Sequence, residues 1–258
     1  MSAFVTDAGD GGLPLTGERT VPGVAVENYW FRRHEVVYAR LAQLCAGRDV
    51  LEAGCGEGYG ADLIASVART VIAVDYDAAA VAHVRNRYPR VQVLAGNLAS
   101  LPLGDAAVDV VVNFQVIEHL WDQPQFITEC LRVLRPGGLL LISTPNRITF
   151  TPGSDTPVNP FHTRELNAAE LAELLTGAGF RIDGLYGVFH GPRLLEMDIR
   201  HGGSIIDAQI ARALADAPWP AELATDVAAV RTEDFDLLRA DERDIDDSLD
   251  LVAIAVHP

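Results

Sequence analysis

Glycines are concentrated in the segment Glu52-Ala-Gly54-Cys-Gly56-Glu-Gly58-Tyr-Gly60, which begins at the end of a short apolar run. The run at 49–54 predicts a buried strand, and residues 58–68 predict a helix. Glycine allows the backbone to turn sharply between a strand and a helix, and it allows a ligand to approach the main chain closely. The segment therefore predicts a ligand-binding turn in an α/β fold.

The rest of the chain alternates between short apolar runs and amphipathic segments. Strands this apolar, separated by helices, indicate a mostly parallel sheet that is covered on both faces. We expect a Rossmann-like doubly wound sheet of seven strands, with a helical insertion before the last strand. The expected strands are 49–54, 70–75, 91–96, 108–114, 139–144, 180–189 and 248–257, and the expected helices are 27–45, 58–68, 78–88, 123–134 and 168–178.

Four regions follow from this pattern. Residues 1–24 are expected to form an N-terminal tail and turn, and residues 25–190 the Rossmann-like core that binds the cofactor. Residues 191–247 lie between two expected core strands that a short turn could join, so we interpret them as a helical insertion that acts as a lid or substrate wall. Residues 248–258 return as the last core strand.

The composition excludes several classes of function. The formal net charge is −16, and an acidic surface repels phosphate backbones, so we expect no nucleic-acid partner. No apolar run is long enough to span a bilayer, and the N-terminus lacks the features of a secretory signal. The three cysteines are few and odd in number, which favours a reducing compartment. We expect a cytoplasmic protein with no membrane partner; a homodimer stays open.

An acidic residue ends the second expected strand. Asp75 lies nineteen residues after Gly56, where a carboxylate can accept hydrogen bonds from the two hydroxyls of a ribose. That ribose can belong to NAD or to S-adenosylmethionine (SAM). A dinucleotide turn requires G-x-G-x-x-G directly after the strand, and Tyr59 stands where the third glycine is needed. The spacing favours SAM.

The motifs resemble those of class I SAM-dependent methyltransferases. Glu52 opens the glycine motif, Asp75-Tyr76 resembles the second motif, and Gly96-Asn97-Leu98 resembles the adenine-binding segment. The family usually has Asp at the position of Asn97, whose amide oxygen can still accept a hydrogen bond from adenine. The cofactor contacts that this resemblance implies in the core are Glu52, Gly54, Gly56, Tyr59, Asp75, Tyr76, Asn97, Leu98 and Asn113.

Two further cofactor contacts are proposed in the segment 27–34. It resembles segments of methyltransferases associated with glycan assembly. Tyr29 could stack on a sugar or on the sulfonium, and Arg33 could pair with the methionine carboxylate. The alternative, which we weigh equally, is an amphipathic helix whose aromatic side chains are core contacts.

A candidate metal site follows the fourth expected strand. If residues 115–119 form a helical turn, Gln115, Glu118 and His119 lie on one face. The combination with His162 resembles the small-RNA 3′-end methyltransferases and the ubiquinone-pathway O-methyltransferases, and it implies a divalent ion, Mg²⁺ or Mn²⁺, on Gln115, Glu118, His119 and His162. Many class I methyltransferases, however, carry the Ile-Glu-His sequence without a metal.

This arrangement suits methyl transfer to a hydroxyl group. A metal ion lowers the pKa of a hydroxyl, and a nearby imidazole can take its proton. The expected catalytic residues are His119, Glu118, His162 and His190, and His201 is a further candidate base.

Almost the whole chain resembles the mycobacterial sugar 1-O-methyltransferases of methylmannose polysaccharide synthesis, including Phe189-His-Gly-Pro-Arg193 and His201-Gly-Gly-Ser204. This resemblance implies a small oligosaccharide acceptor, methylated on the 1-hydroxyl of a 3-O-methylated mannoside. The alternatives are a metal-dependent RNA 3′-end or quinone-precursor O-methyltransferase, an NAD-binding oxidoreductase, and a SAM binder without catalysis.

Overall fold

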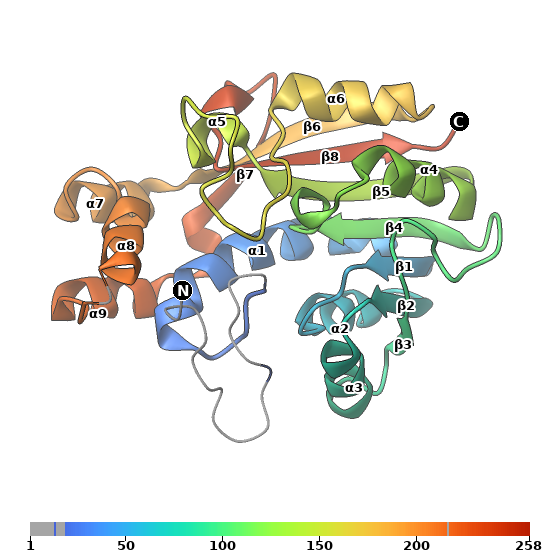
Figure 1. The fold of residues 1–258 in the computed structure, drawn as a ribbon, viewed down its shortest axis with the longest axis horizontal. Helices are drawn as coiled ribbons and strands as arrows, with labels where there is room; N and C mark the ends of the chain where they lie inside the picture. The colour runs from blue at the N-terminus through green and yellow to red at the C-terminus, as the bar shows by residue number, and fades with distance from the viewer. Residues whose placement is uncertain (1–12, 14–18, 216) are drawn as a thin grey trace. The chain divides into compact units, whose positions relative to one another are not determined.

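The structure is a computed structural model that describes residues 13, 19–215 and 217–258. The described residues form one eight-stranded sheet in the order β3-β2-β1-β4-β5-β8-β6-β7 (Figure 1). The strands from β3 to β5 are parallel, whereas β8 is antiparallel to both β5 and β6. The strands are β1 Asp49–Ala53, β2 Thr70–Asp75, β3 Gln92–Ala95, β4 Val108–Phe114, β5 Leu134–Pro145, β6 Arg181–His190, β7 Phe235–Arg239 and β8 Asp250–Val256.

Helices connect β1 to β2, β2 to β3 and β4 to β5, and others precede β1 or follow β5. The α-helices are α1 Asn28–Leu41, α2 Tyr59–Ala65, α3 Ala78–Arg87, α4 Gln123–Val133, α5 Arg147–Phe150, α6 Ala168–Gly177, α7 Pro192–Arg200, α8 Ile205–Leu214 and α9 Ala221–Ala229. Short 3₁₀ turns occur at η1 Ala25–Glu27, η2 Ala42–Cys45, η3 Ile117–His119, η4 Thr232–Asp234 and η5 Ile245–Asp247.

The main core lies between the sheet and two helices. Buried side chains of α4 and α6, among them Phe126 and Leu171, pack against Leu51 of β1 and Leu140 of β5. Both helices lie on the same side of the sheet in Figure 1. Because successive side chains of a strand point to opposite faces, Glu52 points away from this core. It contacts Tyr38 of α1 instead.

The chain forms two compact units. One comprises the described residues up to Val36 together with His190–Asp236, and the other comprises Val37–Phe189 and Leu237–Pro258. The second unit contains most of the sheet, the glycine turn and the segment 115–165. In the first unit, α7, α8 and α9 follow one another, and the side-chain amide of Asn28 donates to the carbonyls of Val227 and Val230.

The α/β fold class is confirmed, and most expected elements occur within a few residues of their expected bounds. The segment 191–247 is mainly helical, as expected, but it also contains the short strand β7. The fifth strand begins earlier than its apolar run, because Leu134 pairs with Val108 before a register shift. Much of the expected tail 1–24 lies outside the described residues. That residues 191–247 border a substrate stays a prediction.

Within the part of the chain that the structure describes, no helix combines the length and the apolar character that crossing a membrane requires.

Candidate functional site

The glycine turn between β1 and α2 depends on backbone that other residues adopt only with strain. Gly54 has φ +86° and Gly58 has φ +96°, both in the left-handed region. A Cβ atom on Gly54 would lie 2.5 Å from a methyl carbon of Val116, and one on Gly58 would lie 2.6 Å from a methyl carbon of Val84. The turn is therefore packed closely against the loop after β4 and against α3.

Asp75 at the end of β2 holds this turn in place. Its Oδ2 accepts from the amide of Gly56 at 2.8 Å, and its Oδ1 accepts from the amide of Asp77 at 2.9 Å. Each carboxylate oxygen has a further lone pair for a ligand hydroxyl. Asp75 is only 7% exposed, so the carboxylate is oriented before any ligand arrives.

Two buried polar groups beside the turn have atoms without a protein partner. Glu52 accepts from the hydroxyl of Tyr38 through Oε1 at 2.6 Å, while its Oε2 is buried without a hydrogen bond. Asn113 donates to the carbonyl of Ala53 at 2.8 Å, while its Oδ1 is likewise buried and unpaired. Leaving such atoms unpaired is costly, so they fit a polar ligand at the carboxyl ends of β1 and β4.

Burial raises the pKa of the Glu52 carboxyl to about 8. The hydrogen bond from Tyr38 opposes this shift, and the charge of Asp75 adds to it. A cationic ligand beside Glu52 would offset the cost of ionising it. SAM carries both a sulfonium and an ammonium group.

The other expected cofactor residues follow the strand ends in the order that the motifs predict. Tyr76 is 74% exposed directly after β2. Asn97 is exposed after β3, and its Oδ1 accepts from the amide of Ala99 at 2.9 Å. Leu98 is buried in the main core, and Tyr59 packs edge-on against Tyr38. Their contact with a cofactor stays a prediction.

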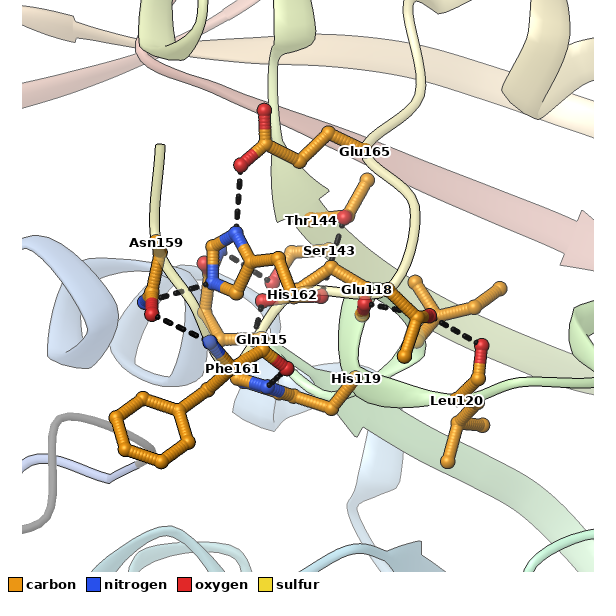
Figure 2. Close-up of polar contacts among 12 residues, drawn as sticks. Gln115, Glu118, His119, Leu120, Ser143, Thr144, Asn159, Phe161, His162 and Glu165 are labelled. Carbon is orange, nitrogen blue, oxygen red and sulfur yellow. Dashed lines mark hydrogen bonds and ion pairs between the residues drawn. The ribbon is translucent and has the colours of Figure 1, made fainter. Parts of the chain in front are cut away.

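The candidate metal ligands Glu118, His119 and His162 come together at the carboxyl ends of β4 and β5. One ligand atom from each of the three lies within 4.8 Å of the other two (Figure 2). Glu118 is 1% exposed and accepts from the hydroxyl of Thr144 at 3.1 Å through Oε2. Burial raises the pKa of Glu118, and the two neighbouring imidazoles oppose this shift.

Gln115 reaches this region through a different local structure from the expected helical turn. It has φ +57°, in the left-handed region, and the 3₁₀ turn η3 begins only at Ile117. Its amide nitrogen donates to Ser143 Oγ at 3.3 Å (Figure 2). Gln115 therefore does not share a helical face with Glu118, and its role as a ligand stays a prediction.

Hydrogen bonds orient both imidazole rings of the cluster. His119 Nδ1 lies 2.9 Å from the carbonyl oxygen of Phe161, which can only accept, so this nitrogen carries the proton. His162 Nδ1 lies 2.6 Å from Oε1 of Glu165. The two ring centroids are 4.9 Å apart. Metal-binding histidines usually donate through the second ring nitrogen in this way.

The loop that carries His162 is attached to the segment after β4. The backbone amide of Thr163 donates to the carbonyl of Glu118 at 2.7 Å, and its hydroxyl donates to the carbonyl of Leu120 at 2.7 Å. Trp121, which follows Leu120 in the chain, is 93% exposed. The contacts of Thr163 explain how residues more than forty positions apart form one cluster.

Tyr29, Arg33 and His190 belong to the first unit. The hydroxyl of Tyr29 lies 2.6 Å from His190 Nε2, and His190 Nδ1 lies 2.6 Å from the carboxylate of Asp198. Tyr29 is fully buried, and Arg33 is 2% exposed with its guanidinium 5.5 Å from the Trp30 ring. These contacts agree with the core alternative for the aromatic side chains, and the cofactor and catalytic roles stay predictions.

His201, the further candidate base, also lies in the first unit. Its Nε2 is 2.9 Å from the carboxylate of Asp226, which Arg200 contacts as well. The hydrogen bonds of Arg200 and His201 hold the pKa of Asp226 below its ordinary value although burial opposes them. This pairing links α7 to α9 and gives His201 a structural role.

Sequence reasoning assigned no role to Glu165, Asn159 or Thr144, which all contact the cluster. Glu165 stands three residues after His162, and a carboxylate close to a candidate ligand histidine was the available signal. The contacts of Asn159 and Thr144 depend on how the loop returns to the end of β5.

Comparisons with known proteins agree with this geometry. A family model described as "Methyltransferase domain" matches residues 51–142. A "Probable S-adenosylmethionine-dependent methyltransferase" of Mycolicibacterium smegmatis is 76% identical over 95% of this chain and 96% of its own length. One of Mycobacterium tuberculosis is 73% identical over 95% of this chain and 90% of its own.

The fold has relatives among solved structures. A "SAM-dependent methyltransferase, possible histamine N-methyltransferase" of Thermotoga maritima has a TM-score of 0.61 and 17% identity, over 90% of this chain and 99% of its own. At this identity the likeness concerns the fold alone.

Proposed function

Because this chain belongs to the class I SAM-dependent methyltransferases, we propose that it methylates a sugar hydroxyl with the help of a divalent cation. The observation that carries the proposal is the cluster of Glu118, His119 and His162 at the sheet edge where β1 and β2 also end. Ligands of doubly wound sheets bind at this edge.

The residues around the glycine turn fit SAM. Asp75 is positioned to accept from the ribose hydroxyls, and the unpaired Oε2 of Glu52 can accept from a cationic group. Tyr76 offers an exposed ring beside the expected adenine position. The 76% identical relative is described as SAM-dependent, which favours SAM over NAD.

The cluster has the donor atoms that a divalent cation needs. It offers one carboxylate and two imidazoles, and the predicted ligand Gln115 would add an amide oxygen. Two imidazoles favour Mn²⁺ or another transition ion over Mg²⁺, which prefers oxygen ligands. A cation at this position would lower the pKa of an acceptor hydroxyl.

The reaction forms a bond between the acceptor oxygen and the methyl carbon and breaks the bond between that carbon and sulfur. The bonding electron pair stays on sulfur, and the hydroxyl proton passes to a base. Since the sulfonium is already a good leaving group, the protein mainly aligns oxygen, carbon and sulfur. Thr144 holds Glu118 in place, and hydrogen bonds hold both imidazole rings. Fixed side chains of this kind would help to align the acceptor oxygen.

Three observations support a carbohydrate acceptor, and the first of them implies the 1-hydroxyl of a 3-O-methylated mannoside. The first is the resemblance of nearly the whole chain to mycobacterial sugar 1-O-methyltransferases. The second is the net charge of −16, which disfavours RNA. The third is Trp121, whose exposed indole two residues after His119 offers an apolar surface for the face of a methylated sugar.

The proposal is tested by incubating the protein with SAM labelled in the methyl group and a panel of acceptors. The panel contains mannosides with and without a 3-O-methyl group, a small RNA with a free 3′ end and a catechol-type quinone precursor. We expect label in the 3-O-methylated mannoside alone. Label in the RNA or in the catechol would replace the sugar proposal with the corresponding alternative.

A further inference from the structure

Glu165 lies behind His162 and is buried completely, with a side-chain exposure of 0%. We propose that Glu165 is a positioning residue that keeps His162 in the tautomer with the proton on Nδ1, so that Nε2 carries the lone pair that an amide donor or a cation can use. This inference deepens the function proposed above and rests on it.

The first argument is the contact between Glu165 and His162. The Oε1 of Glu165 lies 2.6 Å from Nδ1, the length of a strong hydrogen bond to a charged acceptor. An ionised carboxylate can only accept, so Nδ1 must donate. In a neutral imidazole the lone pair then resides on Nε2.

The second argument comes from the opposite side of the ring. Asn159 Oδ1 accepts from the amide of Phe161 at 3.0 Å, which fixes the orientation of the Asn159 amide group. Its nitrogen therefore faces His162 Nε2, at 3.1 Å (Figure 2). An amide nitrogen donates, so it needs the lone pair on Nε2, and a cation bound there would replace the Asn159 hydrogen bond. Both sides of the ring thus require the same tautomer.

The third argument is the rigid support of Glu165. The next residue, Leu166, is fully buried and forms a β-bridge with Asn146, directly after β5. Its carbonyl accepts from the amide of Arg147 at 3.0 Å. Asn167 then caps α6 through the amide of Glu170. The backbone on the C-terminal side of Glu165 is therefore fixed between β5 and α6.

The fourth argument is energetic. The second carboxylate oxygen of Glu165 is buried without a hydrogen bond, an unfavourable arrangement for a group with a structural role alone. A carboxylate that accepts from the ring N–H of a histidine orients that ring and improves it as a metal ligand.

The test combines two measurements on the full-length protein. Correlation spectra of ¹⁵N-labelled imidazole nitrogens at about pH 8 report which nitrogen carries the proton, and the His162→Asn spectrum identifies the signal of His162. Titration with Mn²⁺, followed by the electron paramagnetic resonance of the free ion, reports metal affinity without substrates. The variants are Glu165→Leu, which removes the acceptor, and Glu165→Gln, which keeps an acceptor but removes the charge. Glu173→Gln on the exposed face of α6 is the matched control.

We expect the wild type, Glu165→Gln and Glu173→Gln to keep the Nδ1 proton, and Glu165→Leu to lose this preference. Mn²⁺ affinity should fall about 10- to 100-fold in Glu165→Leu, less in Glu165→Gln, and stay unchanged in Glu173→Gln. A wild-type His162 protonated on Nε2, or a Leu variant with an unchanged tautomer, overturns the inference.

A separate result concerns the metal. If the tautomer depends on Glu165 but the wild type binds no Mn²⁺, the role of Glu165 stands and the metal part of the proposed function fails. If Glu165→Leu does not fold, the wild-type spectrum decides, because protonation on Nδ1 or on Nε2 gives opposite answers.

Discussion

Asp75 at the end of β2 accepts a hydrogen bond from the backbone amide of Gly56, with 2.8 Å between Oδ2 and the nitrogen. Asp75, from the second motif, therefore holds the glycine turn of the first motif, which lies nineteen residues earlier in the chain. If the same carboxylate binds the ribose as proposed, building the turn and binding the cofactor depend on one side chain.

The first prediction concerns this carboxylate. Asp75→Ala should weaken SAM binding by about 1.5–3 kcal/mol, because it removes hydrogen bonds to a charged acceptor. Isothermal titration with SAM measures the effect. Asp183→Asn, an exposed carboxylate of β6, is the control and should bind SAM like the wild type. A folded Asp75→Ala protein with wild-type affinity would contradict the assignment.

The second prediction concerns pH and Glu52. Its pKa is raised from 4.5 to about 8 in the folded protein, so the folded state holds this proton more tightly than the unfolded chain does. This tighter proton binding stabilises the folded state in full below about pH 4.5, and its contribution to the free energy of unfolding is lost as the pH rises to about 8. Relative to Glu52→Gln, the wild type should lose up to about 1.4 kcal/mol of unfolding free energy per pH unit in that window.

Urea unfolding without SAM at several pH values between about 5 and 8.5 measures this difference. Glu173→Gln, which removes an exposed carboxylate, should follow the wild type at every pH. Parallel stability curves for the wild type and Glu52→Gln would show that Glu52 keeps an ordinary pKa.

The third prediction concerns the metal. An excess of EDTA should reduce methyl transfer on the order of 100-fold or more, because the proposed cation would contribute several kcal/mol to the reaction. SAM affinity should stay nearly unchanged, since the glycine turn and Asp75 need no ion. His162→Ala should lose activity as the chelated wild type does. Added Mn²⁺ should restore the activity of the chelated wild type but not that of His162→Ala.

His257→Gln is the control for the loss of an imidazole, because His257 contacts the carbonyl of Leu134 at the opposite end of β5. Full activity of the wild type in EDTA would leave His119 and His162 as candidate base and substrate contacts without a metal.

The fourth prediction concerns Trp121. If its exposed indole stacks on the acceptor, Trp121→Ala should raise the KM for a methylated mannoside about three- to tenfold, corresponding to roughly 1 kcal/mol of aromatic contact. Trp121→Phe should restore most of this loss. An unchanged KM in Trp121→Ala would remove Trp121 from the acceptor site.

The sheet could be predicted from the sequence because its parallel strands are buried on both faces, and strands of this kind consist of apolar runs. The run 108–114, for example, became β4 with its expected bounds. The strand β7 was missed, because Phe235–Arg239 is only five residues long and contains the charged residues Asp236 and Arg239. Its place at the edge of the sheet depends on pairing that no local pattern specifies.

The cluster could be predicted only in part. The identity of Glu118, His119 and His162 followed from resemblance, and the structure brings these three together. The helical turn expected at Gln115 does not form, because that residue adopts a left-handed conformation after β4. Glu165 is not part of any helical or strand pattern in the sequence. Its contact with His162 depends on the conformation of the loop that carries both residues.

The most direct measurement is the position of the transferred methyl group. The protein is incubated with SAM carrying a ¹³C methyl group, Mn²⁺ and a 3-O-methylated mannose acceptor, and the product is examined by long-range carbon–proton NMR correlation. The account predicts that the labelled methyl correlates with the anomeric position, and that the product disappears in EDTA. A methyl group on another hydroxyl would contradict the proposed regiochemistry, and the absence of transfer to this acceptor would contradict the proposed sugar substrate.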